Sequence, residues 1–172
     1  VRALDYLTER QDIERDKIGC IGFSLGGIAA FYSAIVDARI TAVVPVCGGV
    51  GRLETLAKEG NTAYHSTYFY IPNILKHFDH PDLACSIAPR ALLVLARDED
   101  VGMPLSGVRT LESIVSKHYR SVGYPEKFAV HVTHGGHNFS PEMLNDATEW
   151  FKRHMVLFST ITGWFRFWSL GC

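Results

Sequence analysis

The chain has 172 residues, of which 47% are hydrophobic and 20% are charged, and this composition fits one globular domain with a substantial apolar core. Its 17 basic and 18 acidic residues give a formal net charge of −1, which argues against nucleic acid or an anionic membrane as a partner. Its four cysteines are widely spaced and form no CxxC pair, which argues against a zinc site or a dense disulfide framework.

The first part of the chain predicts helices and strands in alternation. Residues 2–9 have apolar side chains at positions 3, 4, 6 and 7, a spacing that suits an amphipathic helix. Residues 17–23 and 40–46 are near-continuous apolar runs, which is the pattern of strands covered on both faces. Between them, residues 28–36 predict a helix whose small side chains allow it to lie close to a sheet.

Residues 47–90 form a connection that is too long for a simple crossover between two strands. A segment of this length inside a compact domain indicates a functional insertion. It is rich in aromatic residues and histidines: Tyr64, His65, Tyr68, Phe69, Tyr70, His77, Phe78 and His80. We expect this insertion to form a lid or one wall of a substrate pocket.

The second part of the chain continues the alternation. Strands are predicted at residues 91–96 and 127–133, and a helix at 105–122. A last helix is predicted at 141–154, with Ser140 as its N-cap and Pro141 at its first position. Strands that alternate with helices predict an α/β fold with three layers, α/β/α, around a mostly parallel sheet.

Ser24 lies at the centre of Gly22-Phe23-Ser24-Leu25-Gly26, between a predicted strand and a predicted helix. A Gly-x-Ser-x-Gly motif at such a junction forms a sharp turn, from which the serine hydroxyl projects at the top of the sheet. The glycines are needed because neighbouring backbone crowds the turn. Since short patterns also match by chance, an ordinary glycine-rich turn is the alternative.

Candidate partners for the serine follow later in the chain. A serine hydroxyl becomes a good nucleophile when a base removes its proton. In sheets of this kind the acid and then the histidine follow on loops after later strands. Asp98, Glu99 and Asp100 follow the third predicted strand, and His137 follows the fourth after two glycines. This order predicts a catalytic triad that contains His137 and one of the three carboxylates.

A metal site is the alternative for the histidines. His131, His134 and His137 are spaced by three residues. However, no cysteine or carboxylate nearby completes such a site, and a segment that passes from a strand into a loop scatters the rings. We therefore expect no metal, and we expect His131 and His134 to be ordinary surface or core residues. Cys20 and Cys47, in or beside apolar strands, are expected to be buried free thiols, which is compatible with a reducing compartment.

Three segments of the chain resemble known enzymes. Residues 16–27 resemble the nucleophile elbow of α/β-hydrolases related to dienelactone hydrolase, acetyl xylan esterase and prolyl oligopeptidase. Residues 78–84 and 87–93 are similar to the segment before the acid strand in the acetyl-xylan-esterase-like members. Residues 136–139, Gly-His-Asn-Phe, are similar to the histidine motif of these proteins. The resemblance covers residues 2–155.

The resemblance implies a function and favours one acid. In this group the acid usually stands four residues before a proline, which favours Asp100, before Pro104, over Asp98. The implied reaction is hydrolysis of a small-molecule carboxylic ester through an acyl-serine intermediate, with no metal or organic cofactor. The implied catalytic residues are Ser24, Asp100 and His137.

The chain departs from the family in the number of strands. The α/β-hydrolase sheet has eight strands, and the chain predicts four, which correspond to the last four. The backbone amide of Leu25 is the expected oxyanion donor, but the second donor normally lies after an earlier strand, which we do not find. The strand at 17–23 then has an exposed apolar edge. We therefore expect the chain alone to be marginally stable and weakly active or inactive.

These observations divide the chain in two. We expect residues 1–155 to be a partial α/β-hydrolase catalytic domain and residues 156–172 to be an apolar, aromatic tail of unknown role, too short for a membrane span. The predicted function is that of a cytoplasmic serine esterase. Two alternatives stay open: a serine peptidase of the prolyl oligopeptidase type, and a catalytically incomplete fragment or binding protein that retains the triad residues. Dienelactone hydrolases use a cysteine nucleophile and prolyl oligopeptidases carry a propeller domain, and neither feature is found here.

Overall fold

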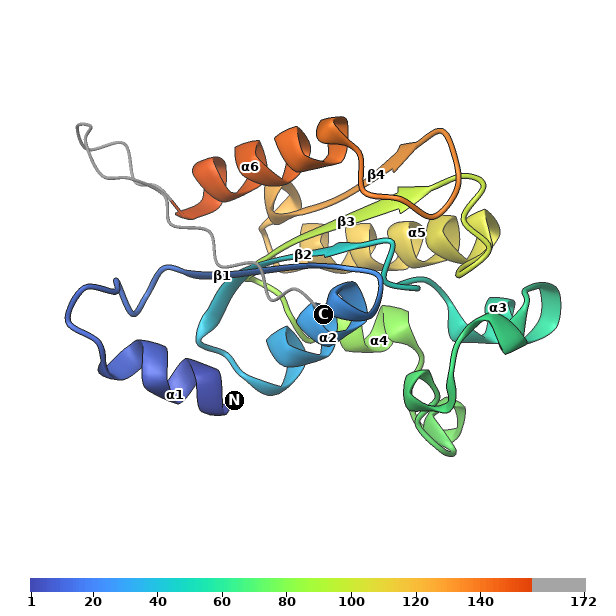
Figure 1. Cartoon of the computed structure of the whole chain (residues 1–172), viewed down its shortest axis with the longest axis horizontal. Coiled ribbons are helices and arrows are strands. Elements are labelled where there is room, and N and C mark those ends of the chain that lie inside the picture. The colour runs from blue at the N-terminus through green and yellow to red at the C-terminus, as the bar shows by residue number, and fades with distance from the viewer. Residues whose placement is uncertain (156–172) are drawn as a thin grey trace.

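The computed structural model describes residues 1–155, and the predicted tail at 156–172 lies outside the described residues. Its helices and strands alternate as predicted (Figure 1). The strands are β1 Ile18–Phe23, β2 Ile40–Val46, β3 Ala91–Arg97 and β4 Phe128–Thr133. The helices are α1 Arg2–Glu9, α2 Leu25–Val36, α3 Leu53–Glu59, α4 His80–Cys85, α5 Leu105–Ser121 and α6 Pro141–Met155. The predicted boundaries are confirmed within a few residues, except that α2 begins directly after Ser24.

The four strands form one parallel sheet in the order β1-β2-β3-β4. Nearly all residues of β2 and β3 are buried, because helices cover both faces of these central strands. Within residues 1–155, β1 pairs with β2 alone, and most of its side chains are only half-buried. The predicted unpaired edge is therefore present in the described part of the chain. Cys47 is a buried free thiol as expected, whereas Cys20 on the edge strand is half-buried.

Helices lie on both faces of the sheet and complete the predicted three layers (Figure 1). On one face, α6 packs its apolar side against β1, β2 and β3 and buries Met143, Trp150 and Phe151. On the other face, α2 packs against β1 and β2, and α5 against β4. No helix within residues 1–155 has both the length and the apolar character that crossing a membrane requires.

The insertion at 47–90 contains α3, three single-turn 3-10 helices and α4. One carboxylate, that of Asp79, joins its two ends. Asp79 accepts hydrogen bonds from the Leu53 and Glu54 amides at the start of α3, at 2.7 and 3.1 Å. It is also the N-cap of α4 in a capping box with Asp82. The insertion is therefore a folded unit, anchored where its first and last helices begin.

Candidate active site

Ser24 sits on a strained turn between β1 and α2. Its φ and ψ of 56° and −118° are unusual for a residue with a side chain. Its amide donates to the Val46 carbonyl at 2.9 Å, which ties the turn to the neighbouring strand β2. A side-chain carbon at Gly22 would lie 2.1 Å from the Gly26 carbonyl oxygen, and one at Gly27 would lie 2.8 Å from that of Val46. The predicted crowding is thus present at Gly22 and Gly27, whereas the space beside Gly26 is open.

The loops that follow β3 and β4 lie side by side because these two strands are paired. The Asp98 amide donates to the Thr133 carbonyl at 3.1 Å, and the Glu99 amide donates to the Gly135 carbonyl at 3.1 Å. These bonds extend the pairing of the strands beyond their ends. The acid loop (residues 98–104) and the histidine loop (residues 134–140) are therefore hydrogen-bonded to each other where they lie beside Ser24.

The structure brings Ser24, His137 and Asp100 together. The Nε2 atom of His137 lies 2.8 Å from the Ser24 hydroxyl oxygen, and its Nδ1 atom lies 2.9 Å from Asp100 Oδ2. The Gly102 amide donates to Asp100 Oδ1 at 2.8 Å. The Asp100 side chain is 6% exposed and that of His137 is 21% exposed, so water screens this pair weakly. A proton can pass from the serine to the imidazole along this line.

Asp98, the alternative acid, bonds a different histidine. Its Oδ2 lies 3.2 Å from His134 Nδ1, and its Oδ1 accepts from the Gly135 amide at 2.9 Å. The hydrogen bond from the Gly135 amide is the main cause that lowers the pKa of Asp98, and the hydrogen bond with His134 lowers it further. The hydrogen bond from Asp98 raises the pKa of His134. The side chains of Asp98 and His134 are far more exposed to solvent than those of Asp100 and His137, and neither is bonded to Ser24.

The three histidines considered for a metal site do not converge. His131 pairs with Asp146 at 2.9 Å, and His134 and His137 pair with Asp98 and Asp100. The expectation that no carboxylate lies nearby was wrong, since each ring has its own. Asp98 and Asp100 lie in the acid loop and Asp146 lies on α6, and each of them bonds a different ring.

Cys47 is a neighbour of the triad that the sequence reasoning missed. It follows β2 directly, and its sulfur donates weakly to the Asn138 carbonyl at 3.7 Å. The thiol, Asp100 and His137 offer three possible metal ligands within 4.8 Å of one another. However, burial and then the charge of Asp100 raise the pKa of the thiol to about 12. A metal here would have to displace that proton and break the bond between Asp100 and His137. The only sequence signal for Cys47 was its position at the carboxyl end of a strand.

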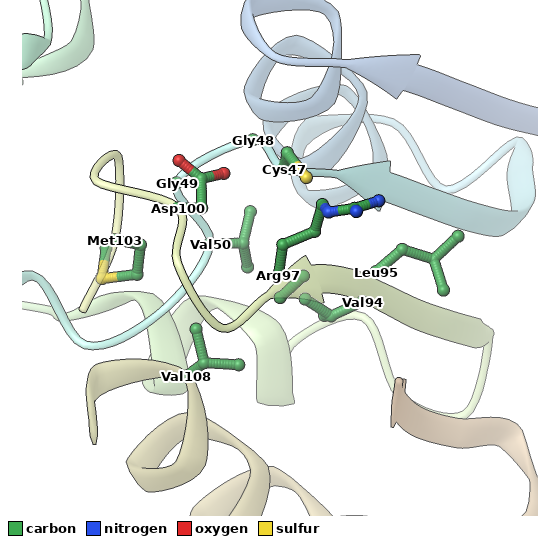
Figure 2. A pocket seen from close by; sticks show the side chains of 11 residues that line it. Cys47, Gly48, Gly49, Val50, Val94, Leu95, Arg97, Asp100, Met103 and Val108 are labelled. Atoms are coloured by element: carbon green, nitrogen blue, oxygen red, sulfur yellow. The ribbon is translucent and has the colours of Figure 1, made fainter. Parts of the chain in front are cut away.

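A small cavity lies behind Asp100, between the acid loop and the end of β2 (Figure 2). Its volume of about 10 Å³ has room for about one water molecule. It is lined by Cys47, Gly48, Gly49, Val50, Val94, Leu95, Ala96, Arg97, Asp100, Met103 and Val108. An ester is too large for this cavity, so a substrate of Ser24 has to lie on the solvent side of the triad.

Apolar and aromatic side chains surround the solvent side. The ring of Tyr64, from the insertion, meets His137 edge-on at a centroid distance of 5.8 Å. Phe23 lies 4.9 Å from the same imidazole and stacks with Phe139 at 6.1 Å. Leu25, Tyr64 and Phe139 are 45%, 41% and 39% exposed. This arrangement offers an apolar surface to a substrate, and Tyr64 comes from the aromatic insertion that the sequence predicts as a lid or pocket wall.

Leu25 is the first residue of α2, so its amide is one of those that have no partner inside the helix. It points from the same turn that carries Ser24. Within the described residues, α1 and a loop precede β1, and no strand does. The loop expected to provide a second oxyanion donor is therefore not found in residues 1–155.

Comparisons with known proteins agree on the architecture. A family model described as "Abhydrolase family" matches residues 1–151. YtaP of Bacillus subtilis (strain 168), which is named as a hydrolase, is 32% identical over 151 residues, which cover 88% of this chain and 50% of YtaP. The chain thus spans about half the length of this relative.

Solved structures with this fold include esterases. A glucuronoyl esterase of carbohydrate esterase family 15 from Caldicellulosiruptor kristjansonii is 21% identical, with a TM-score of 0.73 over 94% of this chain and 52% of that protein. The glucuronoyl esterase catalytic domain from Hypocrea jecorina is 22% identical, with a TM-score of 0.72 over 90% of this chain and 49% of that protein. At this identity the likeness concerns the fold.

Proposed function

The chain is a member of the Abhydrolase family, and from this premise we propose that it is a serine hydrolase that cleaves carboxylic esters through an acyl-serine intermediate. Its membership confirms the α/β-hydrolase resemblance of the sequence. One observation carries the proposal: Ser24, His137 and Asp100 form a continuous hydrogen-bonded line with distances of 2.8 and 2.9 Å. All three follow the carboxyl ends of strands, which is the end of an open α/β sheet where ligands bind.

In the first half of the proposed reaction, the serine is acylated. The Ser24 oxygen attacks the ester carbonyl carbon while His137 Nε2 takes the hydroxyl proton. The carbonyl electron pair moves onto the oxygen, which the Leu25 amide stabilises. Asp100 holds the proton on His137 Nδ1 and stabilises the imidazolium. The tetrahedral intermediate then collapses, and the alcohol leaves with the proton from Nε2.

In the second half, water replaces the alcohol. His137, again neutral, takes a proton from a water molecule that attacks the acyl carbon. The bond between the acyl carbon and the Ser24 oxygen breaks, and His137 returns the proton to the serine. The carboxylic acid is released and the free enzyme is restored, so the cycle consumes only ester and water.

The substrate class is proposed from two sources. The structural neighbours are named as glucuronoyl esterases, and another is described as an acetyl xylan esterase from Bacteroides fragilis NCTC 9343. In this chain, the exposed rings of Tyr64 and Phe139 flank the histidine and suit the apolar face of a sugar. We therefore propose carbohydrate esters as the first substrates to test.

A catalytically incomplete hydrolase or binding protein is the second candidate. It is the function expected if the Leu25 amide is the one oxyanion donor of the site, and no strand precedes β1 in residues 1–155 to supply another. Removing one such donor in a known enzyme costs about 10²- to 10³-fold in kcat. An incomplete site would therefore keep the geometry of the triad and lose most of the turnover.

Labelling with a fluorophosphonate probe separates the two candidates. The hydrolase is expected to form a covalent adduct on Ser24, because the probe requires an activated serine. Ser24→Ala and His137→Ala are expected to abolish labelling, whereas Ser140→Ala, a helix-capping serine, is expected to label at the wild-type rate. Absence of labelling in a folded wild-type chain would reject the proposal that the chain is a serine hydrolase. Comparing acetylated sugars with proline-containing amides then separates an esterase from a peptidase.

A further inference from the structure

A side chain of the insertion, that of His65, makes a hydrogen bond to the backbone of the acid loop. Its Nε2 lies 2.5 Å from the Gly102 carbonyl oxygen. A carbonyl oxygen can only accept, so the ring nitrogen donates. The amide of the same Gly102 donates to Asp100 Oδ1 at 2.8 Å. Gly102 therefore connects the insertion to the carboxylate that bonds His137.

The ring of His65 is held firmly on the insertion. It stacks on Phe69 at a centroid distance of 3.8 Å and an interplanar angle of 8°. Both rings lie against Gly49 at the end of β2, where φ is +69°. A side-chain carbon at Gly49 would lie 2.8 Å from the Phe69 ring and 3.2 Å from that of His65. The backbone thus leaves room for this pair of rings, and the direction of the His65 nitrogen is fixed.

The two residues before Asp100 are tied to the histidine loop, whereas the hydrogen bonds of the Asp100 backbone itself are long. The Asp100 amide to the Arg97 carbonyl and the Met103 amide to the Asp100 carbonyl are both 3.4 Å, which is long for a backbone hydrogen bond. The carboxylate is oriented on one side by the Gly102 amide and on the other by His137. Fixing Gly102 therefore fixes the direction from which Asp100 meets the imidazole.

We propose that His65 is a positioning residue for the reaction of Ser24, acting through Gly102 on Asp100. This inference rests on the proposed function. His65 does not touch the serine or the imidazole, so its effect is on how well Asp100 holds His137 during proton transfer. The insertion is then part of the catalytic machinery as well as a wall beside it. The loss of His65 is expected to lower kcat and to leave KM unchanged.

Three variants of the full chain test this proposal. His65→Phe keeps a ring on Phe69 but removes the donor, and it is expected to lower kcat about tenfold, the size expected for one lost hydrogen bond. His65→Gln places an amide nitrogen within reach of the same carbonyl and is expected to restore most of the rate. His77→Phe is the matched control, because His77 is an exposed histidine of the same insertion that contacts Phe78. It is expected to behave as wild type.

A double-mutant cycle separates positioning from a general structural role. If His65 acts through Asp100, adding His65→Phe to Asp100→Asn produces no further loss of kcat, since the carboxylate to be positioned is already gone. Losses that multiply, or a His65→Phe variant that reacts with a fluorophosphonate as fast as wild type, would overturn the proposal.

If His65→Phe does not fold, His65→Gln and His65→Asn are compared instead. Their side chains differ by one methylene and hence in reach to Gly102. Equal kcat values for the two variants would overturn the inference. A folded wild-type chain that neither labels nor hydrolyses esters rejects the proposed function and this inference together. A wild-type chain that labels, beside a His65→Phe variant that labels equally, rejects the inference alone.

Discussion

Two aspartate–histidine pairs join the loops that follow β3 and β4, and they differ in burial. In the inner pair, Asp100 and His137 are 2.9 Å apart and their side chains are 6% and 21% exposed. In the outer pair, Asp98 and His134 are 3.2 Å apart and their side chains are 36% and 80% exposed. Both pairs form because paired parallel strands deliver their loops to the same edge of the sheet. The fold alone therefore explains why an aspartate meets a histidine here, and such a contact does not by itself indicate catalysis.

What distinguishes the inner pair is its surroundings. His137 has Ser24 on its second nitrogen, and Asp100 has the Gly102 amide behind it. In the outer pair, Asp98 bonds the Gly135 amide and so ties the two loops together. Because water screens the charges of the outer pair, their interaction contributes little to the stability of the fold. We therefore propose that the inner pair acts in catalysis and that the outer pair connects the two loops, and each variant below tests that division.

The largest expected difference is between the two histidines. His137→Ala removes the base and is expected to lower kcat by about 10⁴- to 10⁶-fold, as loss of the histidine does in other serine hydrolases. His134→Ala is expected to change kcat little, because His134 has no bond to Ser24. Steady-state hydrolysis of an activated ester measures both. Equal losses in the two variants would contradict the division.

The next difference is between the two aspartates. Asp100→Asn is expected to lower kcat by about 10⁴-fold, since an amide no longer stabilises the imidazolium and favours the wrong tautomer of His137. Asp98→Asn keeps an oxygen for the Gly135 amide and is expected to retain most of the activity. The same assay measures both rates. A larger loss for Asp98→Asn would make Asp98 the acid.

A third histidine sharpens the comparison, because it is buried beside a tyrosine instead of an aspartate. His80 Nε2 lies 3.1 Å from the Tyr32 hydroxyl, and burial lowers the pKa of His80 to about 4. In the unfolded chain, His80 takes up a proton near its ordinary pKa of 6.5, whereas in the folded protein it stays neutral down to about pH 4. The free energy of unfolding is therefore at its full value above about pH 6.5 and decreases as the pH falls towards 4. The expected loss is about 3 kcal/mol.

Urea unfolding of the wild type and of His80→Gln at several pH values isolates this contribution. The glutamine amide can bond Tyr32 and does not titrate. The difference between the two proteins removes the effect of the carboxylates, which titrate in both. We expect a flatter dependence on pH in His80→Gln, and parallel curves would show that His80 is not the cause.

The smallest expected effect concerns the outer pair itself. The bond from Asp98 raises the pKa of His134, so the stabilisation is present below about pH 6.5 and is lost as the pH rises through that raised pKa. It also requires ionised Asp98, and therefore a pH above about 4. The melting temperature of Asp98→Asn is expected to lie further below that of wild type at about pH 5.5 than at about pH 8, where the bond from the Gly135 amide remains and that with charged His134 is lost. An equal difference at the two pH values would refute the contribution of His134.

Much of this site could be predicted from the sequence because it depends on strand order. Apolar runs define the strands, and parallel pairing brings Ser24, the acid loop and His137 to one edge. Spacing alone did not separate Asp100 from Asp98, since both lie in one loop and both meet a histidine. The resemblance to known hydrolases favoured Asp100, which is the carboxylate that contacts His137 in the structure.

The contacts of the insertion could not be predicted in the same way. Tyr64 and His65 meet His137 and Gly102 because of the path that the insertion takes, and no local pattern specifies that path. One fixed point of the insertion has a local signal in the sequence: Asp79, followed by Pro81 and Asp82, is typical of the start of a helix, here α4. Its second contact, with the start of α3, depends on tertiary structure.

The most direct test of the central claim is to trap the acyl-enzyme. A chromogenic acetate ester is mixed with the full chain, the reaction is quenched within the first turnover, and the peptides are analysed by mass spectrometry. The account predicts one acetyl group per chain, located on Ser24 and absent in Ser24→Ala. Hydrolysis that proceeds with no acetyl group on Ser24, or with the group on another residue, would contradict it.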